Sequence, residues 1–553
     1  MLDSRKKVEA YTKQLVETKS IVNTEGEKDI ANTIHQIISS FPYFQQNPSH
    51  LMIEQTTQDT QERYNVLAFV KGTKRKCDRT VILMGHTDTV GIDDFNQLKQ
   101  YACYPDELMQ QIKNEELPAD IKKELDSDEW MFGRGALDMK SGLASHLYLV
   151  NYYALHPEKL EGNIVFLAEC DEEDSSHGIL SALKTLIKWK EEHHFNYVAA
   201  INADFVSPRY NGDPNRYIYK GTIGKLLPSF FITGEETHVG SCFSGLDPNY
   251  IAAELTRQIN YNPELCDIAY EETTVPPVSL KQTDLKPSYT VQTALSAYVY
   301  YNFFTHSWTP KEVLHKLKDQ AYIAFKNALD SFQEKQRKFS NLRNESVETL
   351  TYEPRVYTYE EMDDMLVEKH DKQYTNHMKD FKEMLLKNKK LDTRMFAARV
   401  VEEAWEWMED KSPTIILFYS SLYSPSISLS GETEKEKDLL QALDVAIEKV
   451  QPNYSHPIVT RNFYPYISDM SFMALNDDEE GINAITTNNP SWGTKHFVDY
   501  EDVRALNVPI INIGPYGNDG HKKLERVEKR YAFEIVPNLT DTVIQEILNN
   551  RKP

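Results

Sequence analysis

The sequence lacks the features of membrane proteins and of disulfide-stabilised secreted proteins. No stretch approaches the roughly 20 apolar residues that are needed to span a bilayer. Residues 1–20 alternate charged and apolar side chains at helical spacing, without the continuous apolar core of a signal peptide. The five cysteines are scattered and include no Cys-X-X-Cys pair, so neither a disulfide framework nor a thiolate zinc site is indicated. We therefore expect a cytoplasmic globular protein.

Positive charge is also scarce, with 61 Lys and Arg against 84 Asp and Glu and a formal net charge of -23. Such a charge repels phosphate backbones and anionic lipid surfaces, so we expect no nucleic acid and no membrane among the partners. A small-molecule ligand is the favoured class. At 553 residues the chain is too long for one compact core, which predicts two domains or one heavily elaborated domain.

The first half of the chain alternates short apolar runs with helical patterns, which is typical of parallel strands joined by crossover helices. The same pattern returns near the C-terminus. We predict an α/β domain with a mixed, mostly parallel sheet and helices on both faces. The predicted strands are 81–86, 163–170, 197–204 and 508–514, and the predicted helices are 140–155, 177–192 and 536–550.

Material of a different pattern lies between the two parts of this domain. It opens with a predicted strand at 224–234 and a helix at 244–259, and from about 310 to 410 it is strongly charged and helical in pattern. Such charged runs are most often solvated helix faces. A further acidic stretch, 91–130, is predicted to be a long surface loop with short helices. The predicted division is 1–219 and 466–553 for the α/β domain and 220–465 for the insert.

Acidic and imidazole side chains follow four of the predicted strands. One such residue would mean little, because a lone histidine is more often structural than a metal ligand. In open α/β sheets, however, ligands bind outside the carboxyl ends of the strands. Mixed histidine and carboxylate ligands without cysteine suit zinc or a similar divalent ion. The candidates are His86 and Asp88, Glu172 and Glu173, Asp204, His521, and Asp138 in the loop GRGALDMKSG.

Two pairs of neighbouring residues sharpen this prediction. Glu172 and Glu173 stand at a strand-to-loop transition, where successive side chains point in different directions. One can bind a metal ion while the other handles a proton, as metal-assisted hydrolysis requires. Asp88 is well placed to orient the imidazole of His86. The alternative is an Asp that caps the chain after a structural histidine.

These motifs resemble the M20 family of co-catalytic zinc peptidases and amidohydrolases. GHTDTV, GRGALDMKSG, DEE before SSHG, Asp204 and GPYGNDGH occur in the order that this family shows. The resemblance covers roughly the first 250 residues and the last 50. It implies a zinc-peptidase-like catalytic domain with an inserted, enlarged α+β lid domain. The length and the large insert resemble most a branch of the family associated with arginine utilization.

The resemblance also implies a role for each candidate residue. Two divalent metal ions are implied, with Zn²⁺ preferred and Co²⁺ or Mn²⁺ as alternatives. Glu172 would be the general base and Asp88 would orient His86. His238, in GEETHVGSC, would stabilise the oxyanion, often from the partner subunit of a homodimer. The implied metal ligands are His86 and Asp204 for one ion, Glu173 and His521 for the other, and Asp138 as the bridge.

The sequence departs from the family pattern in the lid. The segment after His238 lacks the proline that family members often carry, and the lid is much longer than usual. These departures leave substrate recognition and dimerisation through the lid open.

Several residues compete with the implied set. His496 is an alternative to His521 and Asp213 to Asp204, but His521 and Asp204 follow predicted strands. We interpret His146 and His177 as structural or surface residues. Arg461, near Asp469, is a candidate to bind a substrate carboxylate, with a hinge or domain-interface role as the alternative.

The predicted function is a dinuclear metal-dependent hydrolase that cleaves an amide bond in a small peptide or an N-acyl amino acid, with an arginine-related metabolite as one candidate substrate. One alternative is a catalytically silent homologue that binds a ligand or a protein through the lid. Another keeps the fold but uses a single metal ion.

Overall fold

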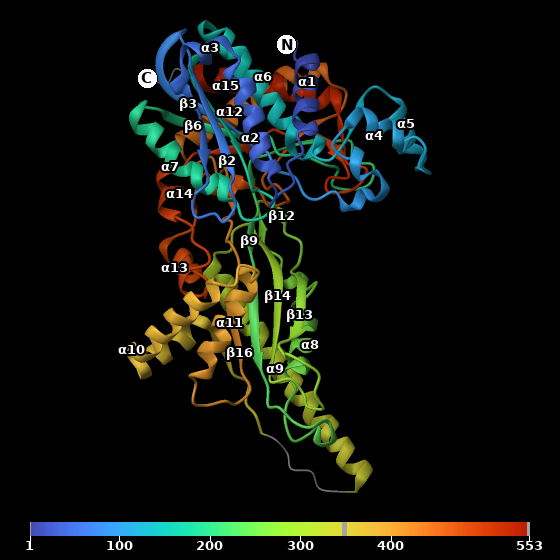
Figure 1. Ribbon diagram of the computed structural model, residues 1–553, viewed down its shortest axis with the longest axis vertical. Coiled ribbons are helices and arrows are strands. Elements are labelled where there is room, and N and C mark those ends of the chain that lie inside the picture. Colours follow the sequence, from blue (N-terminus) through green and yellow to red (C-terminus); the bar gives the residue numbers. More distant parts are fainter. Residues whose placement is uncertain (1, 345–350, 550–553) are drawn as a thin grey trace. The chain divides into compact units, whose positions relative to one another are not determined.

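The computed structural model describes residues 2–344 and 351–549 (Figure 1). The chain divides into two compact units. Unit 1 comprises Met1–Thr222, Ile427–Leu475 and Asp499–Pro553, and unit 2 comprises Ile223–Ser426 and Asn476–Val498.

Unit 1 is built around an eight-stranded mixed sheet in the order β1-β2-β5-β3-β6-β19-β7-β18. The four strands β5, β3, β6 and β19 are parallel to one another, while β2 runs antiparallel to β5 and β7 antiparallel to β19. The strands are β1 (Leu51–Gln55), β2 (Tyr64–Lys71), β3 (Arg75–His86), β5 (Glu161–Glu169), β6 (Asn196–Asn202), β7 (Arg216–Tyr219), β18 (Ile458–Arg461) and β19 (Ile510–Asn512).

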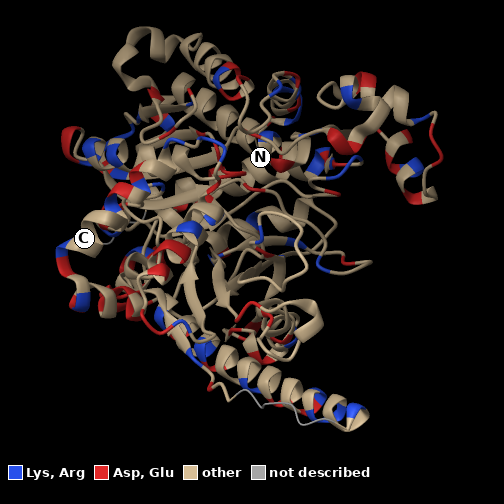
Figure 2. Cartoon of the chain, turned by 60° about the horizontal axis from the view of Figure 1, so that its bottom comes forward, with Lys and Arg blue, Asp and Glu red and all other residues tan. Residues whose placement is uncertain are grey.

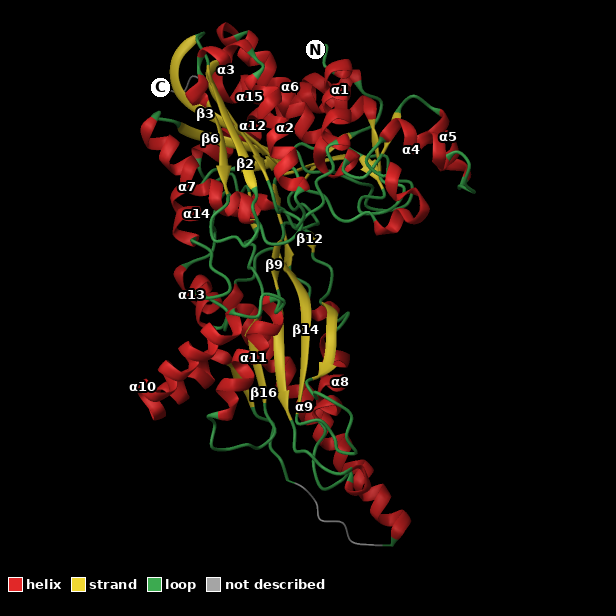
Figure 3. Ribbon diagram, viewed as in Figure 1, coloured by secondary structure: helices red, strands yellow, loops and turns green. Residues whose placement is uncertain are grey.

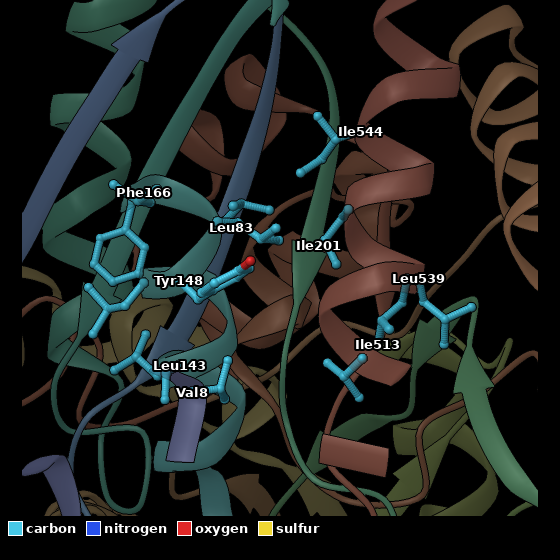
Figure 4. Packing of buried hydrophobic residues seen from close by; sticks show 14 of the residues in the cluster. Val8, Leu83, Leu143, Tyr148, Phe166, Ile201, Ile513, Leu539 and Ile544 are labelled. Carbon is cyan, nitrogen blue, oxygen red and sulfur yellow. The ribbon is translucent and has the colours of Figure 1, made fainter. Parts of the chain in front are cut away.

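Helices cover both faces of this sheet, which explains why its central strands are continuous apolar runs. On one face, Leu143 of α6 and Leu539 of α15 belong to the same core as Leu83 and Phe166 (Figure 4). On the other face, Trp189 of α7 packs edge-on against a side chain of β2, Phe69. The helices are α1 (Arg5–Glu17), α2 (Gly26–Ser39), α6 (Ser141–Leu155), α7 (His177–Glu192), α12 (Glu434–Val450), α14 (Tyr500–Leu506) and α15 (Val536–Asn549). The predicted α/β class with helices on both faces is confirmed.

The acidic stretch 91–130 contains the predicted short helices. It forms η2 (Asp93–Tyr101), α4 (Pro105–Ile112) and α5 (Ala119–Asp126). These helices enclose a small core of their own that includes Phe95, Leu108 and Phe132 of β4 (Trp130–Phe132). The prediction did not include this core, because the few apolar residues that form it are separated by charged residues.

Unit 2 contains a sheet in the order β13-β14-β10-β16-β15, with β9 also paired to β14 (Figure 3). Its pairs are antiparallel except β15 with β16. The helices α10 and α11 bury side chains against Phe231, Tyr298 and Ile416. The elements are β9 (Gly224–Leu226), β10 (Pro228–Thr233), β13 (Val278–Asp284), β14 (Ser296–Thr305), β15 (Val356–Thr358), β16 (Ile415–Tyr419), α8 (Pro248–Ile259), α9 (Pro310–Arg343), α10 (Tyr359–Leu386), α11 (Thr393–Glu406) and α13 (Glu479–Thr487).

The strongly charged region is helical, as its pattern predicts. Thr309 and Thr358 start α9 and α10 with capping boxes, each closed by a glutamate three residues on. Figure 2 shows acidic and basic residues interspersed along the long helix α9. Its ion pairs, such as Lys338 with Glu334, are exposed and contribute little to stability.

The observed division differs from the predicted boundary near residue 465. The chain returns to unit 1 already at Ile427, because α12 buries its apolar face in the core of unit 1 and β18 pairs in parallel with β7. A second segment, Asn476–Val498, belongs to unit 2, where its helix α13 packs against α9. The sequence predicted one segment inserted into unit 1, whereas unit 2 is formed by two segments, Ile223–Ser426 and Asn476–Val498.

Among the residues that the structure describes, no helix is both long enough and apolar enough to cross a membrane.

His146 generates a pH-dependent stability. It is fully buried in α6, and burial lowers its pKa from 6.5 to about 3. Below pH 6.5 the unfolded chain therefore binds a proton that the folded chain does not, so stability falls as the pH drops. The free energy of unfolding decreases when the pH is lowered from 8 to 5. We expect this decrease to be about 2 kcal/mol smaller in His146→Leu than in the unmodified protein. Urea unfolding at both pH values measures this difference.

His156→Leu serves as the control, because that imidazole sits at the exposed C-terminal end of the same helix. An equal pH response in His146→Leu and the unmodified protein would contradict the assignment.

Candidate metal centre

The parallel strands of unit 1 bring the predicted ligands to one edge of the sheet. His86, the last residue of β3, lies opposite Glu169, the last residue of β5. Asn202, at the end of β6, pairs in register with Met84 and with Asn512, at the end of β19. Four strands thus end at the same level, and the loops that follow them converge.

Asp138 lies between two imidazoles. Its Oδ1 is 3.0 Å from His86 Nε2, and its Oδ2 is 2.8 Å from His521 Nε2. Glu173 Oε1 is 3.1 Å from the same nitrogen of His521. One carboxylate therefore connects the two histidines through its two oxygens, which is the arrangement of a bridging ligand.

The backbone of the Asp138 loop is shaped by close approaches. Gly135 has φ +80°, and a Cβ there would lie 2.8 Å from Thr89 Cγ2. At Gly142, in the first turn of α6, a Cβ would lie 2.0 Å from the carbonyl oxygen of Ala203, which follows β6. The two glycines let the loop and the start of α6 lie against the ends of neighbouring strands.

Asp204 and Glu172 complete the acidic group. Burial and the nearby Asp138 raise the pKa of Asp204 to about 7, and the hydrogen bond from the Phe205 backbone to its carboxylate only partly offsets this. Burial raises the pKa of Glu172 well above its ordinary value, and Glu173 raises it further, while His86 opposes the shift. Both carboxylates therefore lie within electrostatic reach of His86.

Asp88 contacts both His86 and the acidic turn that contains Glu172 and Glu173. The Nδ1 of His86 is 3.1 Å from the backbone oxygen of Asp88 and 3.7 Å from its carboxylate. The carboxylate instead accepts the backbone N–H groups of Glu172 (3.2 Å) and Glu173 (3.1 Å). Asp88 thus orients the imidazole through its carbonyl group and fixes the acidic turn through its side chain.

The charge of this group fits a cation. In the described part of the chain, no Lys or Arg forms an ion pair with Asp88, Asp138, Glu172, Glu173 or Asp204. Burying several carboxylates without a counter-charge is costly. Burial disfavours the protonation of His521, but Asp138 and Glu173 outweigh it and raise its pKa to about 11. Metal ions would replace protons at such a site.

Ligand atoms of three residues already lie close enough to hold one ion. A nitrogen of His86 and a carboxylate oxygen each of Asp138 and Glu173 are all within 4.8 Å of one another. Their chemistry, imidazole with carboxylate, suits zinc or a similar first-row ion. These three residues therefore fit a divalent metal ion and form part of the predicted ligand set.

The competing candidates have other surroundings. His496 belongs to unit 2, whereas His521 of unit 1 contacts the predicted ligands Asp138 and Glu173. Asp213 accepts hydrogen bonds from the Arg209 and Asn215 backbone and from the Tyr217 hydroxyl, as a structural turn residue does.

Further histidines of the prediction have other surroundings. His177 lies 2.6 Å from Asp171 through its Nδ1, and His146 is fully buried within α6. His238 is exposed in unit 2, and its Nδ1 accepts the backbone N–H of Gly240.

Three polar residues that support this edge were missed by the sequence analysis. Asn512 accepts the backbone N–H of Asp204 and donates to its backbone oxygen, so it ties two strand ends together. Glu525 and Arg134 form a fully buried ion pair behind the Asp138 loop. Asn512 could have been noticed as a polar residue inside the apolar run 508–514, but nothing in the local sequence marks Glu525.

Comparison with known proteins agrees with this geometry. The model of Peptidase family M20/M25/M40 matches residues 82–508, more than half of the chain. The chain belongs to this family. It is 36% identical to Protein RocB of Bacillus subtilis over 552 residues, which is 99% of this chain and 96% of that protein.

Solved structures show the same fold at low sequence identity. An M20 family metallo-carboxypeptidase from Sulfolobus solfataricus aligns with a TM-score of 0.51 at 11% identity, covering 99% of this chain and 100% of the other. A di-peptidase from Saccharomyces cerevisiae aligns with a TM-score of 0.52 at 11% identity, covering 99% and 97%. This M20 member therefore has the peptidase fold with a lid domain, and unit 2 is that domain.

Removing the central carboxylate should empty the metal centre. We expect Asp138→Ala to reduce bound zinc from about two ions per chain to fewer than one, because the ligands on both sides lose their shared partner. Elemental analysis after dialysis against zinc measures the content.

Asp174→Asn is the matched control, because Asp174 belongs to the same acidic run but is exposed. Full zinc content in Asp138→Ala would rule out a bridging role.

Proposed function

We propose that this M20 family member is a dinuclear metal-dependent hydrolase that cleaves an amide bond in a small peptide or an N-acyl amino acid. The observation that carries the proposal is the bridging position of Asp138 between His86 and His521, with Glu173 beside it. In the proposed assignment, His86 and Asp204 hold one ion, Glu173 and His521 hold the other, and Asp138 binds both.

The metal ions would supply Lewis-acid chemistry. When bound, they would lower the pKa of a water molecule towards about 7 and offset the charge that develops on the substrate carbonyl. Zinc is the preferred ion and cobalt or manganese are the alternatives, because all three accept nitrogen and oxygen ligands.

Glu172 is the proposed general base. Its neighbour Glu173 faces His521, while the carboxylate of Glu172 lies near His86 without an ion pair in the described part of the chain. Glu172 takes a proton from the attacking water as the C–O bond forms. It then gives that proton to the amide nitrogen as the C–N bond breaks, which releases an amine and a carboxylic acid, and the acid loses its remaining proton to the solvent. Asp88 keeps this turn in place through the two backbone hydrogen bonds described above.

Two residues are proposed to act on the substrate. His238 of the lid domain would donate a hydrogen bond to the developing oxyanion, from the same chain or from the partner in a homodimer. Arg461, the last residue of β18, is the candidate to bind a substrate carboxylate as a two-pronged donor. Because an arginine-related metabolite is one candidate substrate, arginine-containing peptides and N-acyl arginines should be tested first in a substrate screen.

Replacing the general base should separate metal binding from turnover. We expect Glu172→Gln to retain about two zinc ions while kcat falls at least about 100-fold, because the proton has no acceptor. Elemental analysis and hydrolysis of the best substrate of the screen measure the two effects. Normal turnover in Glu172→Gln would refute the mechanism.

The same experiment addresses the alternatives. Two zinc ions with no hydrolysis of any substrate by the unmodified protein would favour a silent homologue that binds a ligand or a protein. Full activity at one ion per chain in a metal titration would favour a single-metal enzyme.

His238 should affect the reaction without affecting the metal ions. We expect His238→Ala to lower kcat roughly 100-fold or more at unchanged zinc content, because one oxyanion donor is lost. His156→Leu, a histidine change in unit 1 away from the predicted ligands, is the control. Unchanged kcat in His238→Ala would exclude it as the donor.

A further inference from the structure

Glu525 is a fully buried carboxylate that faces the backbone of the Asp138 loop. Its Oε1 accepts the N–H groups of Gly135 at 2.8 Å, Leu137 at 3.2 Å and Asp138 at 3.3 Å. Its own backbone oxygen accepts the N–H of Gly133 at 3.1 Å. The loop that presents Asp138 thus has its amide groups gathered around one side chain.

Arg134 connects the same carboxylate to a third segment. Its Nη1 donates to Glu525 Oε2 at 2.6 Å, and its Nη2 donates to both carboxylate oxygens of Asp94 at 2.8 and 2.9 Å. Its Nε donates to the backbone oxygen of Gly91 at 3.0 Å. The Arg134 side chain is 1% exposed, and its guanidinium group lies over the ring of Phe95. Each of the three nitrogen atoms of the guanidinium group therefore donates a hydrogen bond.

Each of the three connected segments lies next to or contains one predicted metal ligand. Gly91 and Asp94 follow the strand end with His86, the Asp138 loop begins at Arg134, and Glu525 follows His521 by four residues. One of the hydrogen bonds that Glu525 accepts comes from the backbone N–H of Asp138 itself. A shift of Glu525 would therefore move Asp138 relative to both histidines.

We propose that Glu525 and Arg134 form a positioning pair that fixes the Asp138 loop between the segments of His86 and His521 and so sets the affinity of the site for its metal ions. This inference rests on the proposed function. Neither residue belongs to the predicted metal ligands, so both would act through the Asp138 loop that they hold.

The cost of burying the pair supports a positioning role. A buried ion pair often contributes no more to stability than apolar residues of the same volume would, because both charges must leave water. This pair is nevertheless completely hydrogen-bonded, with four donors converging on one carboxylate. A carboxylate is the side chain that can accept this many hydrogen bonds at once, and outer partners of this kind orient metal ligands in other proteins.

Glu528 provides a matched control at the end of the short strand β21 (Arg526–Glu528), which begins directly after Glu525. It is buried, it accepts Arg216 Nη2 at 2.7 Å and the Tyr454 hydroxyl at 2.7 Å, and it makes no contact with the Asp138 loop in the described hydrogen bonds. Glu525→Gln and Glu528→Gln each remove one charge from a buried Glu–Arg pair. Only the first changes a segment that carries predicted ligands.

The test compares zinc affinity, measured by competition with a chromogenic chelator, with the melting temperature of the metal-free protein. We expect Glu525→Gln to raise the zinc Kd at least about tenfold, as loss of an outer partner typically does. Glu528→Gln should change the Kd less than about twofold, although both variants should melt at lower temperature than the unmodified protein. A merely structural role predicts lower melting temperatures with equal zinc affinity in both variants, and that result would overturn the proposal.

A second variant keeps the test decisive if Glu525→Gln does not fold. Asp94→Asn weakens the outer anchor of Arg134, and the Asp94 carboxylate is 34% exposed, so this change leaves the core intact. We expect a severalfold rise in the zinc Kd. Unchanged affinity in Asp94→Asn would then overturn the proposal. If the unmodified protein bound no zinc, the proposed function itself would fail, and this outcome is recognised before any variant is made.

Discussion

The concentration of negative charge at the carboxyl ends of four parallel strands is the constraint on which the rest of this structure depends. Asp138, Glu173 and Asp204 are gathered with Asp88 and Glu172, and the only ion-pair partners described for them are His86 and His521. Such a group is unfavourable in a folded interior unless a cation shares it. Burial and the nearby Asp138 also raise the pKa of Asp204, and Asp138 and Glu173 outweigh burial and raise the pKa of His521, so that both side chains favour their protonated forms.

A layer of hydrogen bonds behind the ligands holds this charge in place. Asp88 binds the backbone of the acidic turn, Asn512 joins the end of β19 to Asp204, and Glu525 collects the amide groups of the Asp138 loop. Each of these contacts joins residues that are far apart in the chain. The predicted ligands are therefore held by contacts between distant segments rather than by their own loops alone, and such outer contacts orient the ligands in known metal sites.

Unit 2 is stabilised by its own apolar contacts. It has a long capped helix, α9, and the helices α10 and α11, whose apolar sides form a core separate from that of unit 1. Each unit therefore buries its own apolar surface. In unit 1 the adjacent strands β5, β3, β6 and β19 form the frame of the candidate site.

The sequence by itself determined the elements and the chemistry of the ligands. The apolar runs 81–86, 163–170, 197–204 and 508–514 correspond to β3, β5, β6 and β19, because a strand buried on both faces must be continuously apolar. The acidic and imidazole residues after them could be named because parallel strands end at one edge. Only the tertiary structure decided the return of the chain to unit 1 at Ile427, the carbonyl contact of Asp88 with His86, and the place of Glu525 behind Asp138. These depend on contacts between residues tens to hundreds of positions apart or on the exact direction of a side chain, and a local pattern of residues contains neither.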